Sequence, residues 1–324
     1  MTRTHTAIWV LPLVFAGGCL DLGLLDELVP IDAGSEGAGA DVDTDADADG
    51  DGPPPTDEDD TAAPALLPVS CAPGEDAREG LCIAWGPGTA AIRLGTDEPA
   101  TIGPTAPEGV RAEVVSEPWA LEHVVVVAGL PPLVEVDFAI SLADVNGNSA
   151  EHALLLTALD GPMVAITEVL ADPMGAEPAQ EFVEIANYGA ATVDLAGWMI
   201  DDNGDDNGDL LPDGCAIAPG QAALLVAADY DPASAEDPAP AAGALIIHLG
   251  SSIGTGGLKN DAAETVELYD ADGEIVSAYD GRIGDPAEGR SAARVRAEAP
   301  DGCPLAFGDA PLDPPDPGAV RFVP

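Results

Sequence analysis

Short apolar runs, separated by turn-forming residues, recur through residues 81–159 and constrain the fold more than any other feature of the sequence. The runs are Leu81–Trp85, Ala90–Leu94, Val110–Val115, His123–Val127, Leu133–Leu142 and Ala153–Leu159, and Gly, Pro, Asp and Asn lie between them. Several short strands at this spacing are typical of an antiparallel β-sandwich. The 324-residue chain also contains 37 Gly and 31 Pro, which favours turn-rich β structure over long helices. The sequence therefore predicts an all-β protein.

The N-terminus has the pattern of a secretory signal. Arg3 supplies a positive start, and Ala7–Ala16 is an apolar run. The run is about half as long as the ~20 residues that a membrane-spanning helix needs. Residues 1–18 are therefore predicted to be a signal peptide.

The end of this segment, Ala16–Cys19, resembles the lipobox of bacterial lipoproteins, in which the cysteine becomes the lipidated first residue of the mature chain. The resemblance implies that Cys19 is lipidated and that the protein lies in the cell envelope, with the membrane as a partner through the lipid anchor. Leu20 follows Cys19 where an inner-membrane retention signal would have Asp. This favours the outer membrane, on its cell-surface or its periplasmic face. An ordinary small-residue cleavage site is the alternative.

A long acidic segment follows the cysteine. Residues 31–68 lose all apolar periodicity, and no Lys or Arg occurs between Arg3 and Arg78. Such a segment cannot bury enough apolar surface to offset its ordering entropy, so residues 19–68 are predicted to be a disordered tether. The whole chain has 59 acidic and 10 basic residues, a net charge of −49. This charge excludes nucleic acid as a partner, because phosphates are bound by clustered Lys and Arg.

The first predicted module spans residues 69–160. Its stretch Gly129–Pro132, the strand residue Phe138 and the hairpin Asp144–Asn148 resemble the later strands of fibronectin type III domains. The resemblance implies an immunoglobulin-like β-sandwich.

The second predicted module spans residues 161–318, before a tail of residues 319–324. Its segments Ile166–Leu170, Glu181–Asn187 and Asp194–Trp198 resemble the lamin tail domain, another immunoglobulin-like sandwich, in sequence and in order. The residues that carry this resemblance are Glu168, Glu181, Phe182, Glu184, Asn187, Leu195, Gly197 and Trp198. The predicted architecture is thus two β-sandwiches after a signal peptide and a disordered acidic linker.

The five cysteines fit an exported chain. If Cys19 carries lipid, an even set of four remains for disulfides in an oxidising compartment. Four cysteines allow three connectivities. We favour Cys71–Cys82 and Cys215–Cys303, because each pair then lies within one predicted module.

Two segments could carry chemistry. Gly250–Gly254 satisfies G-x-S-x-G, but no His follows Ser252, whereas α/β-hydrolases need Ser, acid and His in that order. The second segment alternates oxygen-bearing side chains that could wrap calcium, and these are Asp201, Asn203, Asp205, Asn207 and Asp209. The alternative is a polar loop, since the Gly and Glu of an EF-hand loop are missing. No cofactor is certain, and calcium is the one that the sequence suggests.

These features predict a non-enzymatic cell-envelope lipoprotein that displays β-sandwich binding or adhesion modules on a flexible acidic tether. The expected ligand is an unidentified protein or polysaccharide. The alternative is an accessory subunit that positions a secreted or envelope hydrolase.

Overall fold

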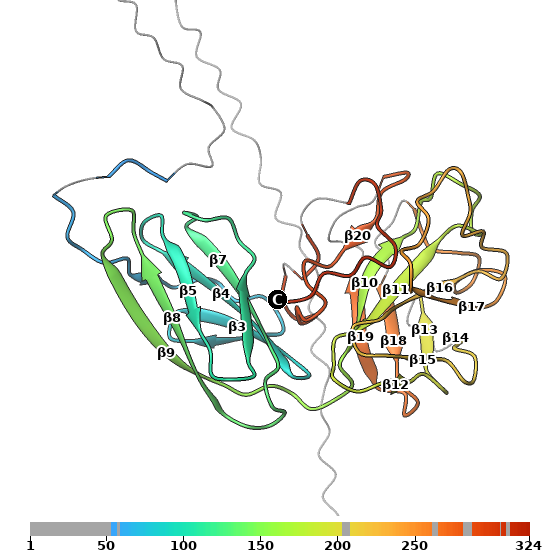
Figure 1. Ribbon diagram of the computed structural model, residues 1–324, viewed down its shortest axis with the longest axis horizontal. Coiled ribbons are helices and arrows are strands. Elements are labelled where there is room, and N and C mark those ends of the chain that lie inside the picture. The colour runs from blue at the N-terminus through green and yellow to red at the C-terminus, as the bar shows by residue number, and fades with distance from the viewer. Residues whose placement is uncertain are drawn as a thin grey trace, which may run out of the picture. The chain divides into compact units, whose positions relative to one another are not determined.

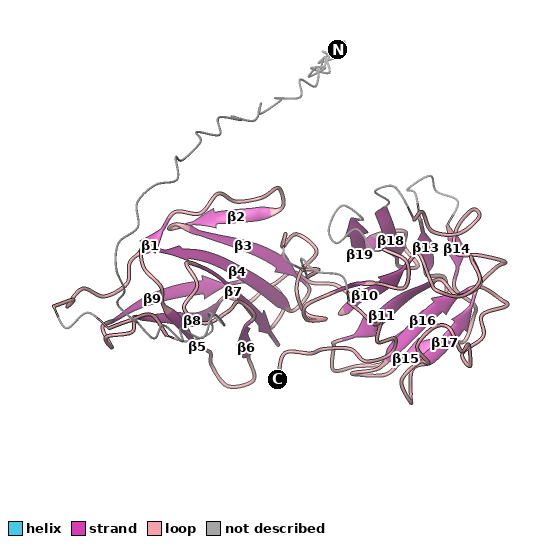
Figure 2. Cartoon of the chain, turned by 90° about the horizontal axis from the view of Figure 1, so that it is seen from above, coloured by secondary structure: helices cyan, strands magenta, loops and turns pink. Residues whose placement is uncertain are grey.

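The computed structural model describes residues 53–56, 59–202, 208–260, 265–280, 287–304, 306–308 and 312–324. Every regular element in these ranges is a strand (Figures 1 and 2). The strands build two successive β-sandwiches, one from residues 66–156 and one from residues 164–293. The predicted all-β class is confirmed. Among the described residues no helix is long and apolar enough to cross a membrane.

The first sandwich has sheets of six and three strands. The larger sheet has the order β2 (Glu75–Arg78), β3 (Leu81–Gly86), β4 (Thr89–Thr96), β7 (Glu122–Ala128), β6 (Arg111–Val114), with β1 (Leu66–Leu67) also paired to β4. The smaller sheet has the order β5 (Thr101–Thr105), β8 (Val136–Ala143), β9 (Ser149–Leu156). In β8 every second residue is buried, and Phe138 is 3% exposed. This alternation places the apolar face of the smaller sheet against the larger one.

The strand β7 is buried on both faces. Val125 and Val127 pack in the core of the first sandwich, whereas Val124 and Val126 join a cluster that includes residues of the second sandwich and of the C-terminal segment. Small side chains on the same outer face, Ala84, Ala91 and Ala128, belong to that cluster too. A run of consecutive valines, rather than an alternating pattern, is what a strand covered on both faces requires.

The second sandwich also pairs two main sheets. One has the order β17 (Leu245–His248), β16 (Ala222–Val226), β11 (Phe182–Asn187), β10 (Val164–Leu170), β20 (Ala292–Ala293), and only β16 and β17 run parallel. The other has the order β14 (Asp209–Leu210), β13 (Met199–Asp201), β18 (Thr265–Tyr269), β19 (Ile275–Asp280). A short pair joins β12 (Val193–Asp194) to β15 (Ala216–Ile217).

Several residues that carry the lamin-tail resemblance build this core. Phe182, Leu195 and Trp198 are at most 4% exposed. Gly197 has a φ of +80°, a left-handed conformation that favours glycine. The Asn187 amide donates to the carbonyl oxygens of Ala191 and Ile217, at 2.7 and 2.9 Å, and fixes the chain after β11. These residues are recognisable in the sequence because the fold needs them.

Part of the stretch that the sequence assigns to the tether contributes to the first sandwich. Leu66 and Leu67 form β1, and Leu66 packs against the core. The Asn148 side chain donates to the backbone oxygen of Asp60 at 3.2 Å. Cys19 and the rest of residues 1–52 lie outside the described residues.

The predicted Cys71–Cys82 disulfide is present, with a Cα–Cα distance of 5.2 Å. It joins the segment before β2 to β3. We expect the double substitution Cys71→Ser and Cys82→Ser to lower the free energy of unfolding by about 3 kcal/mol, because the unfolded chain regains the entropy of a short closed loop. Urea unfolding of both proteins under non-reducing conditions measures the difference. An unchanged midpoint would contradict this expectation.

The predicted Cys215–Cys303 disulfide is wrong, since Cys215 carries a free thiol. Cys215 lies just before β15, where its carbonyl oxygen accepts the Leu195 N–H at 2.9 Å. Cys303 closes a turn whose neighbouring Gly302 packs against Gly74 of the first sandwich. Different elements therefore hold the two residues. The sequence could not show that Cys303 lies in a turn that also contacts the first sandwich, because residue 303 was assigned to the second module alone.

Candidate functional site

A cavity of about 430 Å³ lies between the two sandwiches. This volume is within the usual range for small-ligand sites, about 300–1,000 Å³. Four segments supply its main walls, and they are the β3–β4 turn at 85–87, the linker at 159–162, the β18–β19 hairpin at 270 and 274–277, and the C-terminal segment at 297–302. A site of this kind depends on tertiary structure, because no single segment supplies it.

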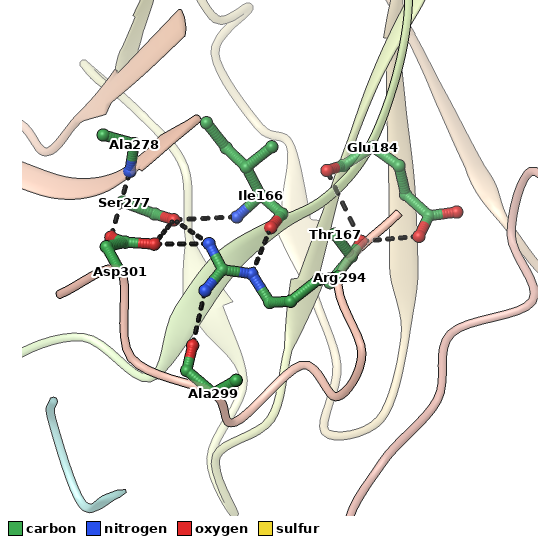
Figure 3. Close-up of polar contacts among 8 residues, drawn as sticks. All are labelled: Ile166, Thr167, Glu184, Ser277, Ala278, Arg294, Ala299 and Asp301. Atoms are coloured by element: carbon green, nitrogen blue, oxygen red, sulfur yellow. Dashed lines mark hydrogen bonds and ion pairs between the residues drawn. The ribbon is translucent and has the colours of Figure 1, made fainter. Parts of the chain in front are cut away.

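Arg294 lines the cavity from within the second sandwich and is 3% exposed. Its guanidinium pairs with Asp301 and donates to the backbone oxygens of Ala299 and Ile166, the latter at 2.6 Å (Figure 3). The guanidinium carbon also lies 4.7 Å from the centre of the Phe307 ring. The charge of Arg294 is therefore already compensated by the protein.

The Ser277 hydroxyl in this wall is also engaged in hydrogen bonds within the protein. Ser277 donates to Asp301 at 3.2 Å and accepts from the Ile166 N–H at 3.0 Å (Figure 3). No histidine is among the residues that line the cavity. A serine nucleophile needs an adjacent base, so these lining residues do not form a serine–histidine pair.

The aromatic wall of the cavity is held in place by hydrogen bonds. The Trp85 indole N–H donates to Asp76 at 2.8 Å, and Arg78 lies 5.1 Å from the centre of the same ring. The Tyr188 hydroxyl donates to the Pro87 oxygen at 3.3 Å. Burial raises the pKa of Tyr188, so it stays a neutral hydroxyl. Both rings are preorganised for contact with a ligand.

Two buried glutamates of the lamin-tail pattern hold the C-terminal segment. Glu168 accepts from the Ser291 hydroxyl and from the Asp316 N–H. Glu184 accepts from the Thr167 hydroxyl at 2.5 Å (Figure 3) and from the Gly318 N–H. Burial raises the pKa of Glu168 to about 8 and that of Glu184 to about 7. We assign both residues to the scaffold, because their acceptors are used by the protein itself.

Two reciprocal ion pairs connect β6 to the C-terminal segment. Arg111 pairs with Glu298 at 3.2 Å, and Arg296 pairs with Glu113. Arg111 also donates to the backbone oxygen of Val323, which is fully buried. Two of the 10 basic residues of the chain therefore pair with carboxylates at this interface.

We expect Arg296→Glu to lower the free energy of unfolding by about 2 kcal/mol, because it leaves Glu113 facing a like charge in a partly buried site. The exchange of both charges, Arg296→Glu with Glu113→Arg, should restore most of the loss. Chemical unfolding of the three proteins measures the effect. Equal stability of the single and double variants would exclude direct pairing.

Two of the predicted calcium ligands lie in β13 and β14, which pair with each other. Asp201 ends β13 and is 1% exposed, and Asp209 begins β14. The Asp209 carboxylate accepts the Gly254 N–H at 2.7 Å. Asn203, Asp205 and Asn207 lie outside the described residues. Calcium binding at this loop stays a prediction.

The loop at 250–258, which begins with the G-x-S-x-G segment, donates backbone hydrogen bonds to carboxylates of the same chain. Besides the Gly254 contact, the Leu258 N–H donates to Glu181 at 2.8 Å. The Ser252 hydroxyl donates to the Gly254 oxygen and accepts from the Gly256 N–H, at 3.0 and 3.3 Å. This serine therefore shapes its own loop. The Leu258 contact gives Glu181 of the lamin-tail pattern a structural role.

A separate group of carboxylates could hold a metal ion. Oxygen atoms of Asp60, Glu98 and Asp144 lie within 4.8 Å of one another. Burial, and then the neighbouring Asp60 and Asp144, raise the pKa of Glu98. Asp144 accepts two hydrogen bonds from Asn148 in the β8–β9 turn. The Asn148 side chain, which also donates to the Asp60 backbone oxygen, connects the end of the tether to the first sandwich.

The sequence did not identify the cavity. Trp85 and Tyr188 belong to different predicted modules, and Glu274 belongs to a hairpin recognised only as a turn. No local pattern connects these positions. Only the packing of the C-terminal segment against both sandwiches could have revealed them.

Comparison with known proteins supports one part of this architecture. No curated protein matches the chain. A crystal structure of a DUF4876 family protein from Bacteroides thetaiotaomicron VPI-5482 is similar at 11% identity, over 70% of this chain and 93% of that chain, with a TM-score of 0.26. A similarity this low supports no conclusion about function. Residues 158–281 match the family model of the Lamin Tail Domain, so the second sandwich is similar to that family, as the segments around Glu168, Phe182 and Trp198 predict.

Proposed function

We propose that this protein is a non-catalytic lipoprotein of the cell envelope, anchored through Cys19, whose two β-sandwiches bind a partner at the cavity between them. One observation carries the binding role. The cavity presents fixed aromatic rings and carboxylates, while its serine and its arginine are already engaged by the protein. Such a surface is suited to recognition rather than to bond cleavage.

The anchor is tested by Cys19→Ala, which should move the protein from the membrane fraction to the soluble fraction. Cys215→Ala is the matched control, because it removes a thiol without touching the lipobox. If Cys19→Ala protein stays in the membrane fraction, the lipid anchor is excluded.

Protease shaving of intact cells then determines the face of the membrane. Release of peptides from residues 67–324 is expected if the modules are displayed on the cell surface. Protection until the outer membrane is opened would instead place them in the periplasm, and would exclude surface adhesion. Co-purification with one hydrolase would favour the alternative role of an accessory subunit.

A further inference from the structure

The cavity between the sandwiches has an excess of negative charge. Four acidic residues line it, and they are Asp160, Asp270, Glu274 and Asp301. Arg294 is the one basic residue of the lining, and it is already paired with Asp301. The other three carboxylates form no ion pair with any described residue. A cationic ligand would therefore gain charge pairing that the protein itself does not supply.

The aromatic residues narrow the class of cation. Two guanidinium groups near the cavity already contact rings. Arg294, a lining residue, lies over Phe307 outside the lining at 4.7 Å, and Arg78 lies over the lining residue Trp85 at 5.1 Å. Arg78 is not itself a lining residue. A planar guanidinium can stack on an aromatic face and bond a carboxylate at its edge, which an ammonium does less well. The cavity combines the same two elements, in Trp85 and Tyr188 with Asp270 and Glu274.

The geometry points to a binding site for the guanidinium group of an arginine, presented by a basic segment of a partner protein. This inference rests on the proposed binding function and specifies its ligand. The net charge of −49 makes a basic partner the complementary one, because long-range attraction accelerates the encounter of opposite charges. Asp270 and Glu274 belong to the hairpin between β18 and β19, so a segment that reaches them contacts the second sandwich while its guanidinium lies against Trp85 of the first.

The test is a binding titration of the full chain with the peptide acetyl-Gly-Gly-Arg-Gly-Gly-amide, followed by calorimetry at low and at physiological ionic strength. Three matched probes are used. In two of them the arginine of the peptide is replaced, by citrulline, which keeps the shape and removes the charge, or by lysine. The third is free arginine amide. The cavity variant is Asp270→Asn with Glu274→Gln. Its control is the double variant Glu108→Gln with Asp213→Asn, which removes two exposed carboxylates outside the cavity lining. The control changes the net charge by the same amount as the cavity variant.

We expect saturable binding of the arginine peptide that is about tenfold weaker in the cavity variant, the cost of about 1.4 kcal/mol in lost charge pairing. The control variant should bind within about twofold of the parent protein, and the lysine and citrulline peptides should bind more weakly than the arginine peptide. Weaker binding of free arginine amide than of the peptide supports a protein segment as the source of the guanidinium.

Three results would overturn the inference. They are equal binding of the citrulline peptide, equal losses in the cavity and control variants, and no binding of the arginine peptide. Free arginine amide that binds as tightly as the peptide would overturn the assignment to a protein segment. Circular dichroism of both variants checks that they fold, since the Asp270 carboxylate accepts turn N–H groups that an asparagine oxygen can also accept. None of these results affects the outcome of the Cys19→Ala fractionation. The proposed lipid anchor and the proposed guanidinium ligand can therefore be contradicted independently.

Discussion

Replacement of Arg294 by methionine is expected to lower the free energy of unfolding by about 3–5 kcal/mol, because it removes one partner of a buried charged network. Methionine fills similar space but donates no hydrogen bond. The carbonyl oxygens of Ile166 and Ala299 would lose their donor, and Asp301 would lose its counter-charge. Each buried acceptor left without a partner costs about 1–3 kcal/mol.

Chemical unfolding at neutral pH measures this loss. The control is Arg290→Met, whose guanidinium pairs with Asp313 while both side chains are about half exposed, at 47% and 59%. Exposed pairs contribute about 0–1 kcal/mol, so this variant should remain close to the parent protein. A similar small loss for both variants would show that the network around Arg294 is not a stabilising element.

Glu168→Gln is expected to stabilise the protein at pH 8 by several kcal/mol, since each unit of a pKa shift corresponds to about 1.4 kcal/mol. Burial raises the pKa of Glu168 from 4.5 to about 8 in the folded state. Between these two pH values the folded protein holds a proton that the unfolded chain has released. The contribution of Glu168 to the stability of the parent protein should therefore be greatest below about pH 4.5. It should fall as the pH rises toward 8.

Unfolding midpoints at pH 5, 6.5 and 8 measure this dependence. The glutamine variant should show a shallower decline, because its amide has no proton to lose, and its oxygen can still accept from Ser291. Glu236→Gln, at an exposed site, removes the same charge and should keep the parent slope. Parallel curves for Glu168→Gln and the parent protein would mean that another group causes the pH dependence.

The parts of the fold that local patterns encode could be predicted from sequence. The short apolar run Leu133–Leu142 identified β8, where every second residue is buried. The segments around Glu168, Phe182 and Trp198 were identified through their resemblance to the lamin tail domain, and Phe182 and Trp198 lie in the core. The Cys71–Cys82 bond was predicted because both partners lie within one predicted module, and it is present.

The parts that depend on distant segments could not be predicted. Val124–Val127 reads as an ordinary strand, and only the structure shows that its outer face is covered by the C-terminal segment. The same segment contains Cys303, whose expected disulfide with Cys215 is not formed, and it completes the cavity around Trp85. Long-range packing of an irregular segment has no period that a sequence pattern could display.

The covered outer face of β7 has a consequence for biosynthesis. The strands of the first sandwich are synthesised before Phe307 and Val323, which belong to the apolar cluster on that face. Until those residues emerge, Val124 and Val126 present an uncovered apolar surface, and exposed surface of this kind promotes aggregation during folding. Maturation of the first module therefore waits for translation of the second, and a prematurely terminated product would be a substrate for chaperones and proteases.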